Sequence, residues 1–93
     1  MIVGTAWIEL HIPGVSSLKG KRQIIKSMKE KIRNRFNVSI AEVEKQDLWQ
    51  RATLGLACVA HDKRAVNRIL SKVINFIEQN KNISLTDYKI EIL

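Results

Sequence analysis

The residues of this 93-residue chain that could do chemistry are mainly cations, and they are unevenly spread. Sixteen Lys and Arg face nine acids, which gives a net charge of +7. Half of the cations lie between positions 19 and 35, where Glu30 is the only acid: Lys19, Lys21, Arg22, Lys26, Lys29, Lys31, Arg33 and Arg35. Such a cluster favours polyanionic partners, for example nucleic acid, although a basic surface also serves solubility.

The first turn of a predicted helix carries three of these cations, Lys19, Lys21 and Arg22. Helix N-termini normally favour acidic residues, because the macrodipole is positive there. Cations beside the free N–H groups of a helix start would form an anion trap that suits a phosphate. The alternative is that these side chains are solvated, some of them paired with Asp47 or Glu44.

A basic stripe continues along the same helix, since four cations recur at helical spacing: Arg22, Lys26, Lys29 and Arg33. Such a stripe can follow a phosphate backbone. Charged runs on helices are also common on faces that meet only water. The stripe therefore supports a phosphate-binding site only together with the helix start.

Trp49 lies in a polar link between two predicted strands, and Gln50 and Arg51 follow it directly. The predicted topology brings this link beside the basic helix start. There Trp49 could stack on an exposed base while Gln50 and Arg51 contact the nucleic acid. The alternative is that Trp49 closes the bottom of the core, with Leu48 as its neighbour.

No set of residues predicts catalysis, a metal or a cofactor. His11 and His61 end two antiparallel strands and so lie at opposite ends of the sheet, whereas zinc needs three or four converging ligands. Cys58 is the only cysteine; it is expected to be buried and inert, and an unpaired cysteine fits a cytoplasmic protein. A small-molecule anion-binding protein or an acylphosphatase-like hydrolase using the loop 13–22 and Arg22 is an alternative, but the compact Gly-x-Val-Gln-Gly-Val loop of acylphosphatases is missing. A structural protein-interaction module is the other alternative.

Hydrophobic periodicity predicts four strands and two helices. Residues alternate over four segments, which is typical of half-buried strands: 2–12, 38–44, 51–60 and 83–92. Apolar residues repeat at helical spacing from a cap at Ser16 or Ser17 to Asn37, and from a cap at Asp62 to Asn80. No apolar run approaches the roughly 20 residues that span a bilayer, so no membrane partner is expected.

This order of elements predicts a single ferredoxin-like β-α-β-β-α-β domain of the α+β class over residues 1–93. Right-handed crossovers give a four-stranded antiparallel sheet of order 4-1-3-2, with both helices on one face. The loop 13–22, the link 45–51 and the turn 80–83 then lie at the same end of the molecule.

The sheet face without helices is unusually apolar for a surface that meets water. Gly55 on this face leaves room for a close approach, and such surfaces are typical of subunit contacts. The sequence therefore predicts a homodimer through the open face, and pairing through the edge strand 38–44 is the alternative. Four residues are expected in the interface: Val3, Trp7, Ala57 and Val59.

Three segments resemble the YlxP-like family of small bacterial proteins: Ser17–Arg22, Arg33–Val43 and Gln46–Ala52. The run Gln-Asp-Leu-Trp-Gln-Arg is specific, whereas Glu44-Lys45 replaces the Asp-His pair that often precedes it in the family. The resemblance implies a ferredoxin-like fold and no known activity. Genes of this family often neighbour those of translation initiation and ribosome maturation factors. The resemblance thus implies a non-enzymatic accessory protein that associates with RNA or the ribosome.

Overall fold

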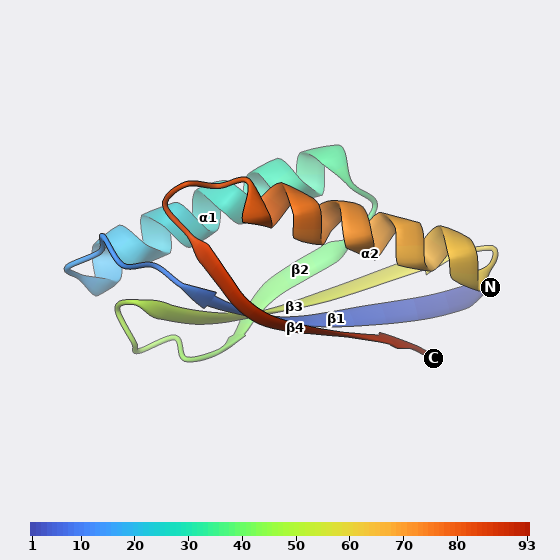
Figure 1. Ribbon diagram of the computed structural model, residues 1–93, viewed down its shortest axis with the longest axis horizontal. Helices are drawn as coiled ribbons and strands as arrows, with labels where there is room; N and C mark the ends of the chain where they lie inside the picture. The colour runs from blue at the N-terminus through green and yellow to red at the C-terminus, as the bar shows by residue number, and fades with distance from the viewer.

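The computed structural model describes residues 1–93 and contains four strands and two helices in the predicted β-α-β-β-α-β order (Figure 1). The strands are β1 (Ile2–His11), β2 (Ser39–Glu44), β3 (Arg51–Ala60) and β4 (Ser84–Ile92). The helices are α1 (Leu18–Arg35) and α2 (Lys63–Glu78). Each element agrees with its predicted range to within two residues.

The sheet has the order β2-β3-β1-β4, and every neighbouring pair of strands is antiparallel. Both helices cover the same face of this sheet (Figure 1). The predicted α+β fold and strand order 4-1-3-2 are therefore confirmed. Neither helix is long and apolar enough to cross a membrane.

Each helix begins at a side chain that binds one of its free backbone N–H groups. Ser17 Oγ accepts from Gly20 N at 3.0 Å, and Asp62 Oδ1 accepts from Ala65 N at 2.8 Å. Of the two candidate serines, Ser17 is thus the N-cap of α1. This cap places Lys19 in the first turn of α1.

The core lies between the sheet and the helices, and alternate residues of β1 and β3 supply its floor. Ile8 and Leu54 face each other across these strands and are fully buried. The sheet comes closest to α2 at Gly4, where an added Cβ would lie 2.2 Å from Cγ1 of Val66. The packing of α2 on the sheet therefore requires a glycine at position 4.

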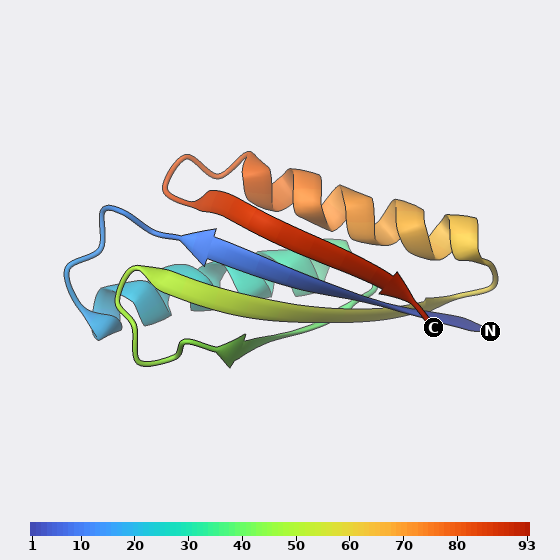
Figure 2. The same ribbon diagram turned by 60° about the horizontal axis from the view of Figure 1, so that its bottom comes forward.

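The three connections β1–α1, β2–β3 and α2–β4 lie toward one end of the molecule, as predicted, and both chain termini lie at the other end (Figure 2). We call the first of these ends the basic end. The connection between β2 and β3, residues 45–50, is called the β2–β3 link.

Candidate nucleic-acid interface

The β2–β3 link is tied to the loop between β1 and α1 by hydrogen bonds. Ile12 N donates to Gln50 O at 2.9 Å. The side-chain amide of Gln50 donates to Val15 O at 3.0 Å and to Pro13 O at 3.4 Å. The two segments are thus adjacent, as predicted. Gln50, however, holds them together with the amide that the sequence analysis assigned to nucleic acid.

Lys21 has a different role from the one that the sequence predicted. Its side chain is fully buried beneath the start of α1. Its Nζ donates to three carbonyl oxygens, those of Lys45 at 2.8 Å, Gln46 at 3.3 Å and Arg51 at 3.0 Å. A lysine has three N–H donors, so none is left for a phosphate. Lys21 does not belong to the binding surface, because it fastens the β2–β3 link to α1.

Glu42 supplies the charge that balances this buried ammonium. Its Oε2 lies 2.8 Å from Lys21 Nζ, and its side chain is 13% exposed. This buried oxygen lies as close to Nζ as the nearest carbonyl does, but it makes no hydrogen bond of regular geometry. The contact is therefore an ion pair. Sequence reasoning named Asp47 or Glu44 as partners for the cations and missed Glu42.

The backbone of the β2–β3 link is fixed in an uncommon conformation. Lys45 has φ 62°, the left-handed region that costs a non-glycine residue free energy. Its carbonyl accepts from Lys21 and from Leu48 N at 3.1 Å, and its ammonium pairs with Glu9. These contacts hold Lys45 in place, and so the link has a defined shape before any partner binds.

This rigid link exposes two large apolar side chains at the basic end. Trp49 is 54% exposed and Leu48 is 48% exposed. The sequence left open whether Trp49 is a contact or a core residue, and the structure places it on the surface. An exposed indole on a fixed loop is suited to stacking, because little further ordering of the loop is needed on binding.

The remaining predicted phosphate ligands fall into two groups. Arg33 donates through Nη2 to Ile40 O at 2.9 Å, so it is partly occupied with β2, and Lys29 is half-buried. The other four are exposed and form no ion pair with any acid: Lys19, Arg22, Lys26 and Arg51. These four side chains, which we call the free cations, lie on the first half of α1 and at the start of β3, and they outnumber the two exposed acids near the β2–β3 link that also form no ion pair, Glu44 and Asp47.

Glu9 is the centre of a polar cluster on the open sheet face that the sequence did not reveal. It accepts hydrogen bonds from Trp7 Nε1 at 3.0 Å, from Thr53 Oγ1 at 3.0 Å, and from Lys45. Burial raises the pKa of Glu9, but the hydrogen bonds from Lys45, Thr53 and Trp7 together outweigh it, and the pKa lies below its ordinary value. The carboxylate thus stays charged at neutral pH and holds the indole N–H of Trp7.

The open sheet face carries a shallow hollow of about 450 Å³ beside Trp7. Val59 and Trp7 are both exposed, whereas Val3 and Ala57 are half-buried within the sheet surface. Gly55 is half-buried and lines this hollow, but Cγ1 of Val43 lies 3.0 Å from where a Cβ of Gly55 would be, so Val43 narrows the approach to this glycine. The register of β2 against β3 shifts at this valine, between Glu42 and Glu44.

The predicted placement of the other reactive residues agrees with the structure. His11 pairs with Arg51 at the basic end of β1, while His61 follows β3 at the other end. Cys58 is buried, and this burial raises the pKa of its thiol despite a hydrogen bond with the backbone of Gly4. A thiol with a raised pKa is a poor nucleophile.

Comparison with known proteins places the chain in a family without a known activity. The family described as "Protein of unknown function (DUF503)" matches residues 3–90. The "Uncharacterized protein YlxP" of Bacillus subtilis (strain 168) is 36% identical over 85 residues, which cover 91% of this chain and 92% of that protein. A solved structure, the "De novo designed protein Foldit4", has a TM-score of 0.53 and 14% identity over 100% of this chain and 97% of that one, a likeness of fold alone. The chain therefore belongs to the DUF503 family and is a relative of YlxP, in agreement with the resemblance of its three sequence segments.

Proposed function

We propose that this protein binds RNA, free or within the ribosome, through its basic end and without catalysing a reaction. The observation that carries the proposal is the group of free cations, Lys19, Arg22, Lys26 and Arg51, on the two elements that adjoin the link with the exposed indole of Trp49. Cations contact the phosphate backbone whatever its sequence. An exposed aromatic ring stacks on unpaired bases, which the loops and bulges of structured RNA provide.

The test is filter binding of a structured RNA with single-stranded loops over a series of salt concentrations. The logarithm of affinity should fall steeply with the logarithm of salt concentration, because phosphate contacts release counterions. The double variant Lys19→Glu/Arg22→Glu should bind at least about tenfold more weakly at low salt and reduce the slope by about 1.5. This corresponds to the loss of two phosphate contacts.

The matched control is Lys63→Glu/Arg64→Glu, which makes the same charge change on exposed residues at the start of α2, at the opposite end. Its affinity should fall much less than that of the variant at the basic end. If both double variants lost the same amount of RNA affinity, binding would depend only on the net charge of the protein and not on the basic end. Absence of binding at low salt would contradict the proposal outright.

We also propose that the protein is a homodimer through its open sheet face. Trp7 is 43% exposed there, although its indole N–H is already bound to Glu9, so only the apolar part of the ring lacks a partner. Burying a large aromatic side chain contributes about 2–3 kcal/mol, and a two-fold axis would bury two of them. Trp7→Glu should therefore convert a dimer at micromolar concentration into a monomer in sedimentation equilibrium.

A matched control for this experiment is Tyr88→Glu. Tyr88 is similarly exposed, at 51%, but it lies opposite Ile8 and so on the helix side of the sheet. This variant should dimerise like the wild type. A wild-type monomer would refute the proposal, and a Trp7→Glu variant that still dimerises would favour pairing through the edge strand β2.

A further inference from the structure

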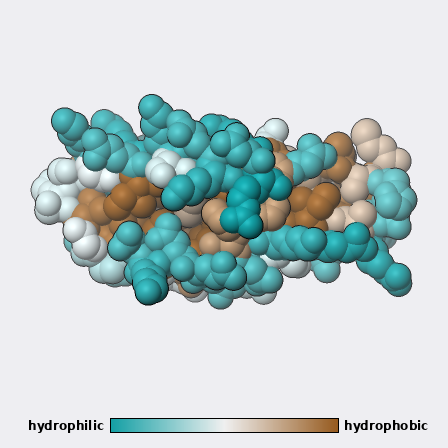
Figure 3. Space-filling view, turned by 90° about the horizontal axis from the view of Figure 1, so that it is seen from above, coloured by the Kyte–Doolittle hydropathy of each residue, from teal (hydrophilic) through white to brown (hydrophobic).

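A groove runs between α1 and α2 on the side of the molecule away from the open sheet face. Figure 3 shows hydrophobic patches along the middle of this face, interrupted near the centre by hydrophilic side chains and bordered by them on both sides. An open pocket of about 560 Å³ lies in it between α1, the end of α2 and the turn after α2. Pockets that bind small molecules typically have about 300–1,000 Å³. The groove is thus large enough for a ligand, and nothing in the proposed RNA interface or dimer uses it.

The apolar part of the groove is formed by Ile24, Met28 and Phe76. The ring of Phe76 is fixed from behind, since it meets Phe36 edge to face at 5.8 Å and the guanidinium of Arg35 lies 4.7 Å from its centroid. The half-buried ring lines the groove and offers part of its apolar surface to a ligand. This surface suits an aromatic ring or an alkyl chain.

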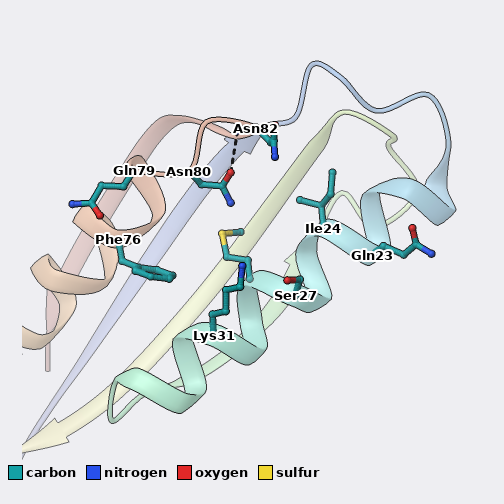
Figure 4. Close-up of a pocket in the computed structure, with 9 residues that line it drawn as sticks. Gln23, Ile24, Ser27, Lys31, Phe76, Gln79, Asn80 and Asn82 are labelled. Carbon is teal, nitrogen blue, oxygen red and sulfur yellow. Dashed lines mark hydrogen bonds between the residues drawn. The ribbon is translucent and has the colours of Figure 1, made fainter.

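The polar part of the groove consists of one cation, Lys31, and of amide and hydroxyl groups. Asn80 Oδ1 accepts from Asn82 N at 2.9 Å, so the amide oxygen is occupied and its NH₂ group is the free end. Figure 4 shows this amide and Lys31 extending into the groove from its two sides. Lys31 forms no ion pair, and no carboxylate lines the groove. The positive charge of Lys31 and the NH₂ group of Asn80 therefore favour a ligand that is an anion.

We propose that this groove binds a small amphiphilic anion. Its carboxylate or phosphate would accept from the ammonium of Lys31 and the amide of Asn80, and its flat or linear apolar body would lie on Phe76 and Met28. A nucleoside monophosphate and a fatty carboxylate both have this chemistry. The site is separate from the RNA interface, because Arg33 on the basic stripe binds β2 while Lys31 lines the groove toward α2.

The test uses two fluorescent probes of nearly equal shape, the anion anilinonaphthalene sulfonate and the neutral phenylnaphthylamine. The anion should bind about tenfold more tightly than the neutral probe, as expected for one charge-assisted hydrogen bond. Lys31→Glu should remove this preference and leave the neutral probe bound. Lys26→Glu is the matched control, since it makes the same charge change on the basic stripe of the same helix and should alter neither affinity.

Two further variants locate the probe. Ser27→Trp, which fills the groove from α1, should abolish the binding of both probes, and Trp7→Glu should leave both affinities unchanged although the open face is also apolar. Displacement of the anion by AMP would identify a nucleotide, and displacement by decanoate a fatty carboxylate. The proposal is overturned if Lys31→Glu behaves like Lys26→Glu, if Ser27→Trp still binds, or if neither compound displaces the probe.

Discussion

Lys21→Met is expected to destabilise the protein by about 3 kcal/mol, at the lower end of the cost of removing one partner from a buried ion pair. Methionine keeps the length and the apolar stem of lysine but has no N–H donors. The carbonyls of Lys45, Gln46 and Arg51 then lose their donor, and Glu42 keeps a nearly buried charge without a partner. Water can reach the β2–β3 link, which limits the loss. Urea unfolding measures the change in the free energy of unfolding.

Lys19→Met is the matched control, because it makes the same substitution two residues earlier at an exposed position. It should change the free energy of unfolding by less than about 0.5 kcal/mol. Adding Glu42→Gln to Lys21→Met should restore part of the stability, since it removes the unpaired charge. If both Lys→Met variants were equally stable, the role assigned to Lys21 would be wrong.

Gly4→Val is expected to destabilise the protein by about 3 kcal/mol, at the upper end for overpacking of a core. The first added carbon would lie 2.2 Å from Cγ1 of Val66, and Leu70 Cδ1 is only 3.2 Å away. A valine in a helix is restricted to one preferred rotamer, so Val66 cannot turn aside. The clash between the new side chain and Val66 can therefore be relieved only if α2 moves away from β1. Urea unfolding and thermal denaturation should both report the loss.

Gly14→Ala provides the comparison at an open position. No atom lies within 4 Å of the added Cβ, and no glycine in the chain has a positive φ. The substitution should stabilise the protein by about 0.4–1 kcal/mol, because alanine reduces the freedom of the unfolded chain. A Gly4→Val variant as stable as the wild type would mean that α2 packs less closely on the sheet than this structure shows.

The fold was predictable because its elements repeat a simple pattern. Strict alternation along β1 places Ile8 and Leu10 toward the helices and Trp7 toward the open face, and the register with β3 agrees with this. Ser17 and Asp62 mark the helix starts through their capping chemistry. Alternation holds up to Val43, which lies beside Gly55 on the open face, and it fails at Glu44, because a bulge in β2 pairs Glu44 with Thr53 of that same face.

The candidate site was predictable in its position and only partly in its residues. Topology brings the helix start and the β2–β3 link together, but residue type alone suggested that Lys21 faces water. Helical spacing would have predicted its burial, because Lys21 precedes Ile25 by four residues and Met28 by seven. All three residues therefore lie on the buried face of α1. Alternation likewise turns Glu42 inward beside Ile40. A lysine and a glutamate at two inward positions predict a buried pair, and the carbonyl ligands follow only from the loop conformation.

The strand order has a consequence for the folding of the chain during synthesis. β1 is made first, yet its two neighbours in the sheet, β3 and β4, end at residues 60 and 92. Until β3 is complete both edges of β1 are unpaired, and one edge stays unpaired until β4 has been made. Each pairing must close a long loop before contacts compensate for the lost entropy. A nascent chain of this topology therefore completes its sheet only with its last strand, and it folds more slowly than a helical bundle of equal length.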